Sequence, residues 1–102
     1  MSRDPRYDIL FEPVKIGPLT SKNRFYQAPH CNGGGYRDPS AVAEMGRVKS
    51  EGGWGVIFTE HTELHHSSEL APFIELRLWD DDDIPMLAKM SDAMHEHNAL
   101  AQ

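Results

Sequence analysis

A continuous apolar run at residues 54–60 constrains the fold of this chain most. It reads WGVIFTE, so apolar side chains do not alternate with polar ones, and the run ends in polar residues. A strand that is apolar on both faces is typical of a parallel sheet that helices cover. We therefore interpret the run as a core strand of an α/β fold.

A hairpin, a strand and a helix are predicted before this run. Residues 9–20 hold two short apolar patches around a turn at Gly17, which indicates a β-hairpin that caps a larger structure. Residues 24–28 predict a first core strand. Asp38 is suited to the N-cap of a helix with proline in its first turn, and this helix runs to about Glu51, where two glycines end it.

The segment after the run is predicted to be mostly irregular. Residues 61–72 indicate a polar loop, and residues 73–79 indicate a short extended or irregular stretch. Four aspartates follow at 80–83. We interpret them as solvated charge at the N-terminus of a second helix, where negative side chains are favourable.

The second helix is predicted from Ile84 to about His97. One mostly apolar stripe, flanked by Met90, predicts the side that covers the sheet: Ile84, Leu87, Ala88, Ser91 and Met94. Asn98 suits the left-handed position that often follows a helix. Residues 99–102 then predict the first part of a further strand.

The alternation of strands and helices predicts right-handed crossovers and a parallel sheet. Either a doubly wound sheet or a (β/α)8 barrel, the TIM barrel, satisfies this pattern. A closed barrel needs about 200 residues or more. If the fold is a barrel, residues 1–102 would supply only a hairpin, two βα units and the start of a third strand; the pattern alone does not choose between the two folds.

Composition argues against several classes of protein. The net charge is −6, and basic residues do not cluster with aromatic ones, which argues against nucleic acid or an anionic membrane surface as a partner. No apolar run approaches the roughly 20 residues of a membrane span, and the first residues lack the apolar core of a secretory signal. With a single cysteine, the sequence fits a reducing compartment, and we expect a cytoplasmic protein.

Cys31 is the leading candidate for chemistry. It lies between a predicted strand and the glycines at 33–35, and parallel α/β folds hold their active sites at such strand ends. A lone cysteine is also often a small buried hydrophobe, and this alternative stays open. His30 would point to the opposite face of an extended segment, so it need not activate the thiol. One cysteine holds neither an internal disulfide nor an iron–sulfur cluster.

The remaining titratable clusters predict no metal site. Histidines and glutamates gather after the central strand, but their spacing matches no metal-binding pattern of defined geometry. The residues in question are Glu60, His61, Glu63, His65, His66 and Glu69. The glycine runs also lack the GxGxxG spacing of a dinucleotide-binding loop.

Three strings carry a resemblance to a known family. They are LFEPVKIGPLTSKNRFYQAPHCNGGG, KSEGGWGVIFTE and RLWDDDDIPMLAKMSDAMHEHNALA, at residues 10–35, 49–60 and 77–101. The chain resembles the FMN-dependent old yellow enzyme superfamily over its whole length. This resemblance implies that residues 1–102 are the N-terminal portion of an FMN-binding (β/α)8 TIM-barrel domain, truncated at its C-terminal end. The PHC string is most similar to the branch of trimethylamine and dimethylamine dehydrogenases and N-methyl amine demethylases.

The resemblance implies roles for five residues. Cys31 matches the cysteine that bonds covalently to FMN in that branch, although some ene-reductases of the superfamily carry a cysteine here that only hydrogen-bonds the flavin. Pro29, His30 and Glu60 match positions beside the cofactor. His61 matches an aromatic residue of a substrate cage, so histidine here implies a smaller or more polar amine; an ordinary loop histidine is the alternative.

The resemblance also implies an activity. The full-length enzyme would oxidise a methylated amine or an N-methyl amino acid and pass the electrons through FMN to a 4Fe-4S cluster and an electron-transfer flavoprotein. The cluster and the catalytic residues would lie beyond Gln102, and the full-length protein would be a homodimer. One alternative is an NAD(P)H-dependent ene-reductase or dienoyl reductase. Another is an inactive truncated fragment, and we expect residues 1–102 alone to be inactive.

Overall fold

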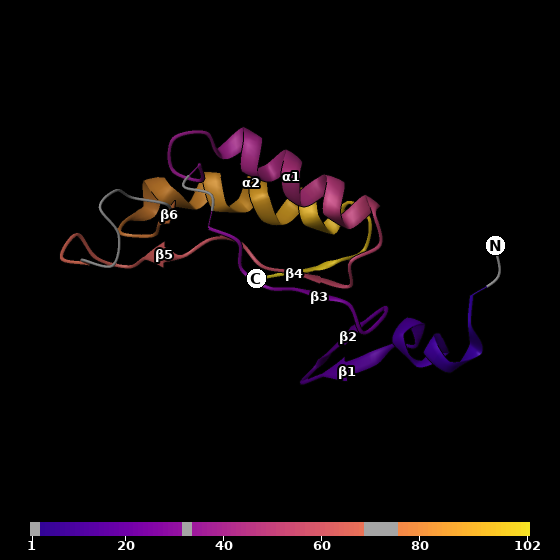
Figure 1. Ribbon diagram of the computed structural model, residues 1–102. Coiled ribbons are helices and arrows are strands. Elements are labelled where there is room, and N and C mark those ends of the chain that lie inside the picture. The colour runs from indigo at the N-terminus through magenta and orange to yellow at the C-terminus, as the bar shows by residue number, and fades with distance from the viewer. Residues whose placement is uncertain (1–2, 32–33, 69–75) are drawn as a thin grey trace.

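The computed structural model describes residues 3–31, 34–68 and 76–102 (Figure 1). Two α-helices pack together on one side of a short parallel sheet, and a hairpin extends away from them. In chain order the elements are η1 (Pro5–Phe11), β1 (Val14–Ile16), β2 (Leu19–Ser21), β3 (Tyr26–Gln27), α1 (Pro39–Glu51), β4 (Val56–Ile57), β5 (Thr62–Glu63), β6 (Leu76–Arg77), η2 (Asp81–Asp83), α2 (Ile84–His95) and β7 (Leu100–Ala101).

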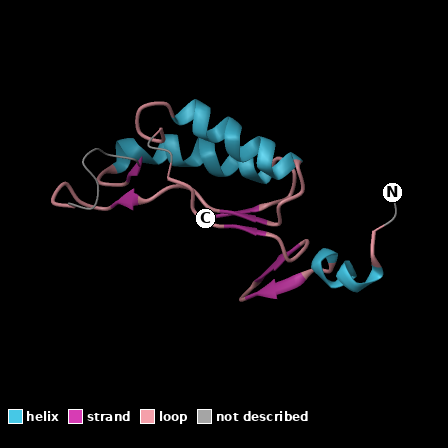
Figure 2. Ribbon diagram, viewed as in Figure 1, coloured by secondary structure: helices cyan, strands magenta, loops and turns pink. Residues whose placement is uncertain are grey.

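The central sheet confirms the predicted parallel topology. Its strand order is β3-β4-β7, with Tyr26 in register with Val56 and Val56 in register with Leu100. Both α-helices lie over the same face of this sheet (Figure 2). The strands are shorter than predicted: β3 occupies two of residues 24–28, and β4 occupies two of residues 54–60.

Helix α1 begins and ends as its sequence predicts. An Asp38 carboxylate oxygen accepts a hydrogen bond from the amide of Ala41 at 3.1 Å, and Pro39 occupies the first turn. Asp38 therefore satisfies one of the amides that a helix start leaves without a partner. The helix ends at Gly52, and Gly53 follows with φ +109°, a conformation that glycine adopts without strain.

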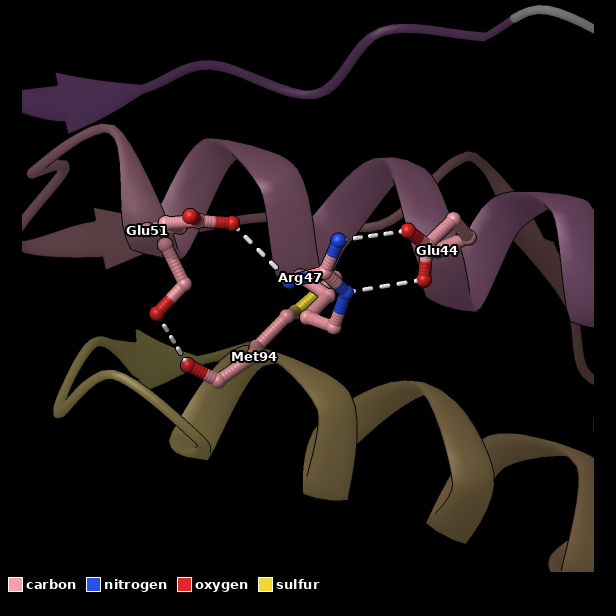
Figure 3. A network of polar contacts seen from close by, with 5 residues as sticks. Glu44, Arg47, Glu51 and Met94 are labelled. Atoms are coloured by element: carbon pink, nitrogen blue, oxygen red, sulfur yellow. Dashed lines mark hydrogen bonds and ion pairs between the residues drawn. The ribbon is translucent and has the colours of Figure 1, made fainter.

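The two helices approach closely because a glycine faces a methionine. A Cβ on Gly46 would lie 2.9 Å from Cγ of Met94, so the contact leaves no room for a side chain. Beside it, the Ser50 hydroxyl donates to the backbone oxygen of Met94 at 2.6 Å (Figure 3). This bond satisfies a carbonyl in the last turn of α2, where intrahelical partners are lacking.

The exposed side of α1 carries a network of ion pairs. Arg47 bonds Glu44 at 2.6 Å and Glu51 at 2.9 Å, one turn away in each direction (Figure 3). Both pairs follow the i, i+3 and i, i+4 spacing that brings side chains together on a helix. They are solvent-exposed, so their contribution to stability is small.

The core lies between the helices and between α2 and the sheet. Met90 packs with Val42, Ala43 and Leu76, whereas Met94 packs with Ile57 and Ala99. The stripe predicted for α2 is therefore only partly correct. Met94 is buried, but Ile84 is 52% exposed, and it lines an open groove beside β7 with Leu87, Ala88 and Ser91. Because α2 packs on α1 as well as on the sheet, its buried side is rotated toward Met90.

The predicted hairpin is confirmed, but it starts later than residue 9. Strands β1 and β2 pair around a turn in which Gly17 has φ +57°. The apolar patch before them instead forms η1, with Asp4 accepting a hydrogen bond from the amide of Arg6. An edge-to-face contact between Phe11 and Phe25 joins η1 to the segment that leads into β3.

The predicted loop at residues 61–72 contains a strand. Thr62 and Glu63 form β5, which pairs in parallel with β6 at Leu76 and Arg77. Two residues are too few for the period-two alternation that indicates a strand in sequence. Part of the predicted extended stretch, residues 73–75, lies outside the described residues.

The end of α2 matches its prediction apart from the last turn. The helix stops at His95, two residues before the predicted end, and Asn98 has φ +66°, the left-handed value expected of it. The predicted strand after it is confirmed as β7. Among the described residues, neither α1 nor α2 has the length and apolar character needed to cross a membrane.

Replacing Gly55 with alanine is expected to lower the free energy of unfolding of the 102-residue chain by about 1–3 kcal/mol. A Cβ at Gly55 would lie 2.5 Å from Oγ of buried Ser21 and closer still to Oδ1 of Asn23. These atoms belong to a turn in which Asn23 also bonds the carbonyl of Gly53, so they have little freedom to move. Urea unfolding followed by circular dichroism measures the loss.

Gly52→Ala provides the matched control for that substitution. A Cβ at Gly52 would meet backbone oxygens at 3.4 Å, an ordinary contact, and its φ of −69° suits any residue. We expect no loss, because alanine reduces the freedom of the unfolded chain without strain in the folded one. Equal losses for Gly52→Ala and Gly55→Ala would show that steric crowding at Gly55 is not the cause.

Candidate flavin site

The candidate site lies where β3 and β4 end. The carboxyl ends of parallel strands meet at one edge of a sheet, which is where α/β proteins hold their ligands. The chain runs from β3 through Pro29 and His30 to Cys31, and from β4 to Glu60 and His61. All five predicted site residues are therefore carried by two neighbouring strand ends.

A direct contact joins the two strand ends. The backbone N–H of His61 donates a hydrogen bond to Sγ of Cys31 at 3.2 Å. Cys31 is exposed, as are Pro29 and His30 before it. The alternative that Cys31 is a buried hydrophobe is therefore wrong, and its sulfur is both accessible and held in position by a backbone amide.

The His61 side chain carries an unused polar atom. The residue is half-buried, and its ring Nε2 is a buried atom without a hydrogen-bond partner among the described residues. Burying a polar atom without a partner is costly, and such an atom calls for an explanation, for example a ligand group. The ring can therefore bond a polar group of a molecule bound next to Cys31.

Glu60 occupies a different environment from Cys31. It is 7% exposed, and it lines a small cavity with His30, Lys49 and Thr59 between α1 and the end of β4. This cavity has a volume of about 20 Å³, which is room for about one water molecule. Glu60 thus lies at the predicted strand end, but beside the helix layer.

The sequence predicted that the aspartates at 80–83 are all solvated, but one of them is buried. Asp83 is 4% exposed, and its Oδ1 accepts a hydrogen bond from Nε of Arg77 at 2.8 Å. Its Oδ2 accepts from the amides of Trp79 and Asp80 at 2.9 and 3.3 Å. The prediction of solvated charge is therefore wrong for Asp83 alone, since the other three aspartates are exposed.

These bonds perturb the ionisation of both partners. Burial alone raises the pKa of Asp83, but the bonds from Arg77, Trp79 and Asp80 together outweigh it, so the pKa lies below its usual range. The hydrogen bond to Asp83 raises the pKa of Arg77. Sequence reasoning missed this pair, because Arg77 falls in a stretch predicted only as short extended or irregular, with no sign of which side chain it would contact.

Potential metal ligands do not come together in the part of the chain that the structure describes. Residues 3–31, 34–68 and 76–102 contain no group of three histidine, cysteine or acidic side chains placed to hold an ion. The rings of His65 and His66 stack at 4.1 Å, and His65 bonds the Ser67 hydroxyl.

Comparison with known proteins defines the class of this chain. The profile of the NADH:flavin oxidoreductase / NADH oxidase family matches residues 9–102, and the chain belongs to this family. It is 46% identical over 101 residues to dimethylamine dehydrogenase of Hyphomicrobium sp. (strain x), and the match covers 99% of the chain and 14% of that protein. The resemblance to the old yellow enzyme superfamily and its amine dehydrogenase branch is confirmed.

A solved structure of an amine dehydrogenase shares the fold. Histamine dehydrogenase from Rhizobium sp. 4-9 superposes with a TM-score of 0.89 at 75% identity, over 94% of this chain and 14% of that one. An NADPH dehydrogenase of Listeria monocytogenes serotype 4b (strain CLIP80459) is 31% identical over 90% of the chain and 28% of its own length. The chain thus spans a small part of these relatives and matches the N-terminal part of a (β/α)8 barrel; its described strands do not close one.

Proposed function

We propose that residues 1–102 are the N-terminal portion of an FMN-binding barrel domain in an amine dehydrogenase. The bond between the His61 amide and Cys31 carries the proposal, because it fixes an accessible sulfur at the sheet edge where such folds hold a cofactor. A flavin held there would supply a two-electron acceptor for oxidation of the amine to an imine, which water would hydrolyse to an aldehyde and the remaining amine or ammonia. The identity with two amine dehydrogenases supports this reaction class.

The chain's own residues would hold and orient the cofactor. Cys31 is exposed and suited to a covalent thioether with the flavin ring, which would fix the ring and alter its electronics. Pro29 and His30 are exposed beside it and would lie along the cofactor. Glu60 lies next to the small cavity and would support the end of β4. Of these four residues, it would make the least direct contact with the flavin.

His61 would select the substrate. Its buried Nε2 is available for a hydrogen bond, which favours an amine with a second polar group over a fully methylated one. Histamine, the substrate named for the 75% identical relative, has such a group. An N-methyl amino acid also has one, whereas dimethylamine does not. We therefore rank histamine first, N-methyl amino acids second and simple methylated amines third.

The rest of the electron path would lie outside these residues. By the branch resemblance, electrons would leave FMN through a 4Fe-4S cluster to an electron-transfer flavoprotein, in a homodimer whose catalytic residues follow Gln102. The 102 residues alone would be inactive. Their parallel sheet has open edges at β3 and β7, and apolar side chains of α2 line an open groove.

Anaerobic titration of the full-length gene product tests the reaction class. We expect histamine to bleach the flavin absorbance near stoichiometry, N-methylglycine and dimethylamine to act more weakly, and NADPH to leave it unchanged. His61→Phe, which removes the polar atom and keeps a ring, should reduce the preference for histamine over dimethylamine. His66→Phe, an exposed histidine of the same loop, is the control.

An ene-reductase is the second candidate function, and the 31% identity with an NADPH dehydrogenase favours it. In that case Cys31 would hydrogen-bond the flavin without a covalent link. Bleaching by NADPH, with no response to any of the three amines, would establish this candidate and overturn the first.

A further inference from the structure

Arg77 lies where three segments of the chain meet. Its Nε donates to Oδ1 of buried Asp83, at the start of α2. Its guanidinium carbon lies 5.0 Å from the ring centre of Tyr36 and 4.8 Å from that of Trp79. Arginine suits this place because its planar group stacks on aromatic rings while its N–H groups bond a carboxylate.

The strand that carries Arg77 also holds the segment that carries His61. In the β5–β6 pair Thr62, the residue after His61, is in register with Leu76, and Glu63 is in register with Arg77. The amide of Leu78 donates to the oxygen of Glu63 at 2.8 Å. The His61 strand end is therefore hydrogen-bonded to the strand on which Arg77 stands.

The side chain of Arg77 contacts the turn that precedes α1. Tyr36 follows the glycine run after Cys31, and the Gly35 before it is buried. The amide of Asp38 donates to the oxygen of Gly34 at 2.7 Å, which ties this turn to the start of α1. The ring of Tyr36 thus belongs to a held turn between Cys31 and α1, and Arg77 stacks on that ring.

We propose that Arg77 is a positioning residue for the contact between Cys31 and His61, although it touches neither of them. The strand of Arg77 pairs with the His61 segment, and its guanidinium stacks on Tyr36, which follows Cys31 in the chain and lies in the turn before α1. The bond to Asp83 anchors the assembly on α2. This inference rests on the proposed function only for its consequence, which is the presentation of Cys31 to a flavin.

Hydrogen exchange at the His61 amide tests the proposal in the full-length gene product. This amide donates to Sγ of Cys31, so its protection reports the contact itself. We expect Arg77→Ala to speed its exchange about tenfold or more through local opening, and Arg77→Lys, which keeps the charge but not the stacking, to show an intermediate effect. Tyr36→Leu removes only the stacked ring and should also speed it.

Arg47→Ala is the matched control. Arg47 also bonds carboxylates, those of Glu44 and Glu51, but it stands on the exposed side of α1. The Arg47→Ala substitution should leave hydrogen exchange at the His61 amide unchanged. Exchange in Arg77→Ala, Arg77→Lys and Tyr36→Leu that equals exchange in Arg47→Ala would overturn the proposal. If Arg77→Ala does not fold, the other two variants decide in the same way.

A second measurement separates this proposal from the proposed function. In the full-length gene product, Arg77→Lys should lower the share of flavin that stays with the chain after denaturation, and Arg47→Ala should not. If wild type binds no flavin, the proposed function fails while the exchange data still decide the role of Arg77. If wild type binds flavin covalently and Arg77→Lys does so equally, with normal exchange at His61, the positioning role is wrong.

Discussion

Cys31→Ala is expected to abolish flavin that stays with the denatured full-length protein. Wild type should retain the mass of one FMN and its yellow colour after denaturation, because a thioether survives the loss of the fold. The variant has no sulfur to form that bond. Intact mass and visible absorbance of the denatured protein measure the difference, and we expect complete loss rather than a partial one.

His66→Ala is the appropriate control for this experiment. It changes an exposed side chain outside the proposed flavin contacts and leaves the sulfur and its bond from the His61 amide in place. Covalent flavin should therefore persist in it. Flavin that binds the native wild type but leaves on denaturation would show that Cys31 only tunes the cofactor, and would favour the ene-reductase function.

Met90→Ala is expected to lower the free energy of unfolding of the 102-residue chain by about 2–5 kcal/mol. Met90 is 0% exposed and packs against Val42, Ala43 and Leu76, so truncation leaves a cavity that joins α1, α2 and β6. The cost combines lost burial with the unfilled space. Urea unfolding followed at a helix wavelength measures it.

Ile84→Ala on the same helix is the control for Met90→Ala. Ile84 is 52% exposed at the open groove, so its truncation should cost less than half as much. Both variants add an alanine to α2, which makes helix propensity a minor difference between them. If Ile84→Ala were the more destabilising variant, the apolar stripe predicted from the sequence would be the buried one after all.

The elements that could be predicted from sequence have strong local chemistry. Asp38 with Pro39 defined the start of α1, glycines defined its end, and Asn98 marked the turn after α2. These signals act over a few residues, so they do not depend on distant packing. The parallel order followed from the alternation of strands and helices and from the apolar run at residues 54–60, which is typical of a covered strand.

The features that escaped prediction depend on contacts between distant segments. The buried side of α2 is set by where α1 packs, which the periodicity of α2 alone does not contain. Asp83 looked like its three exposed neighbours, because its burial depends on Arg77. Within the site, Cys31 was predicted from its place after a strand and His61 from a resemblance, but their hydrogen bond depends on the register of β3 with β4.

The parallel pairing of β3, β4 and β7 also constrains the order in which this chain can fold during synthesis. Strand β4 lies in the middle, and each of its partners is separated from it by a helix. Tyr26 in β3 can pair only after Val56 has been synthesised. Strand β4 then has one unpaired edge until Leu100 has been synthesised. Such non-local pairing forms slowly. Strand β4, whose residues are buried, therefore has one edge open to association with other chains until β7 has been made.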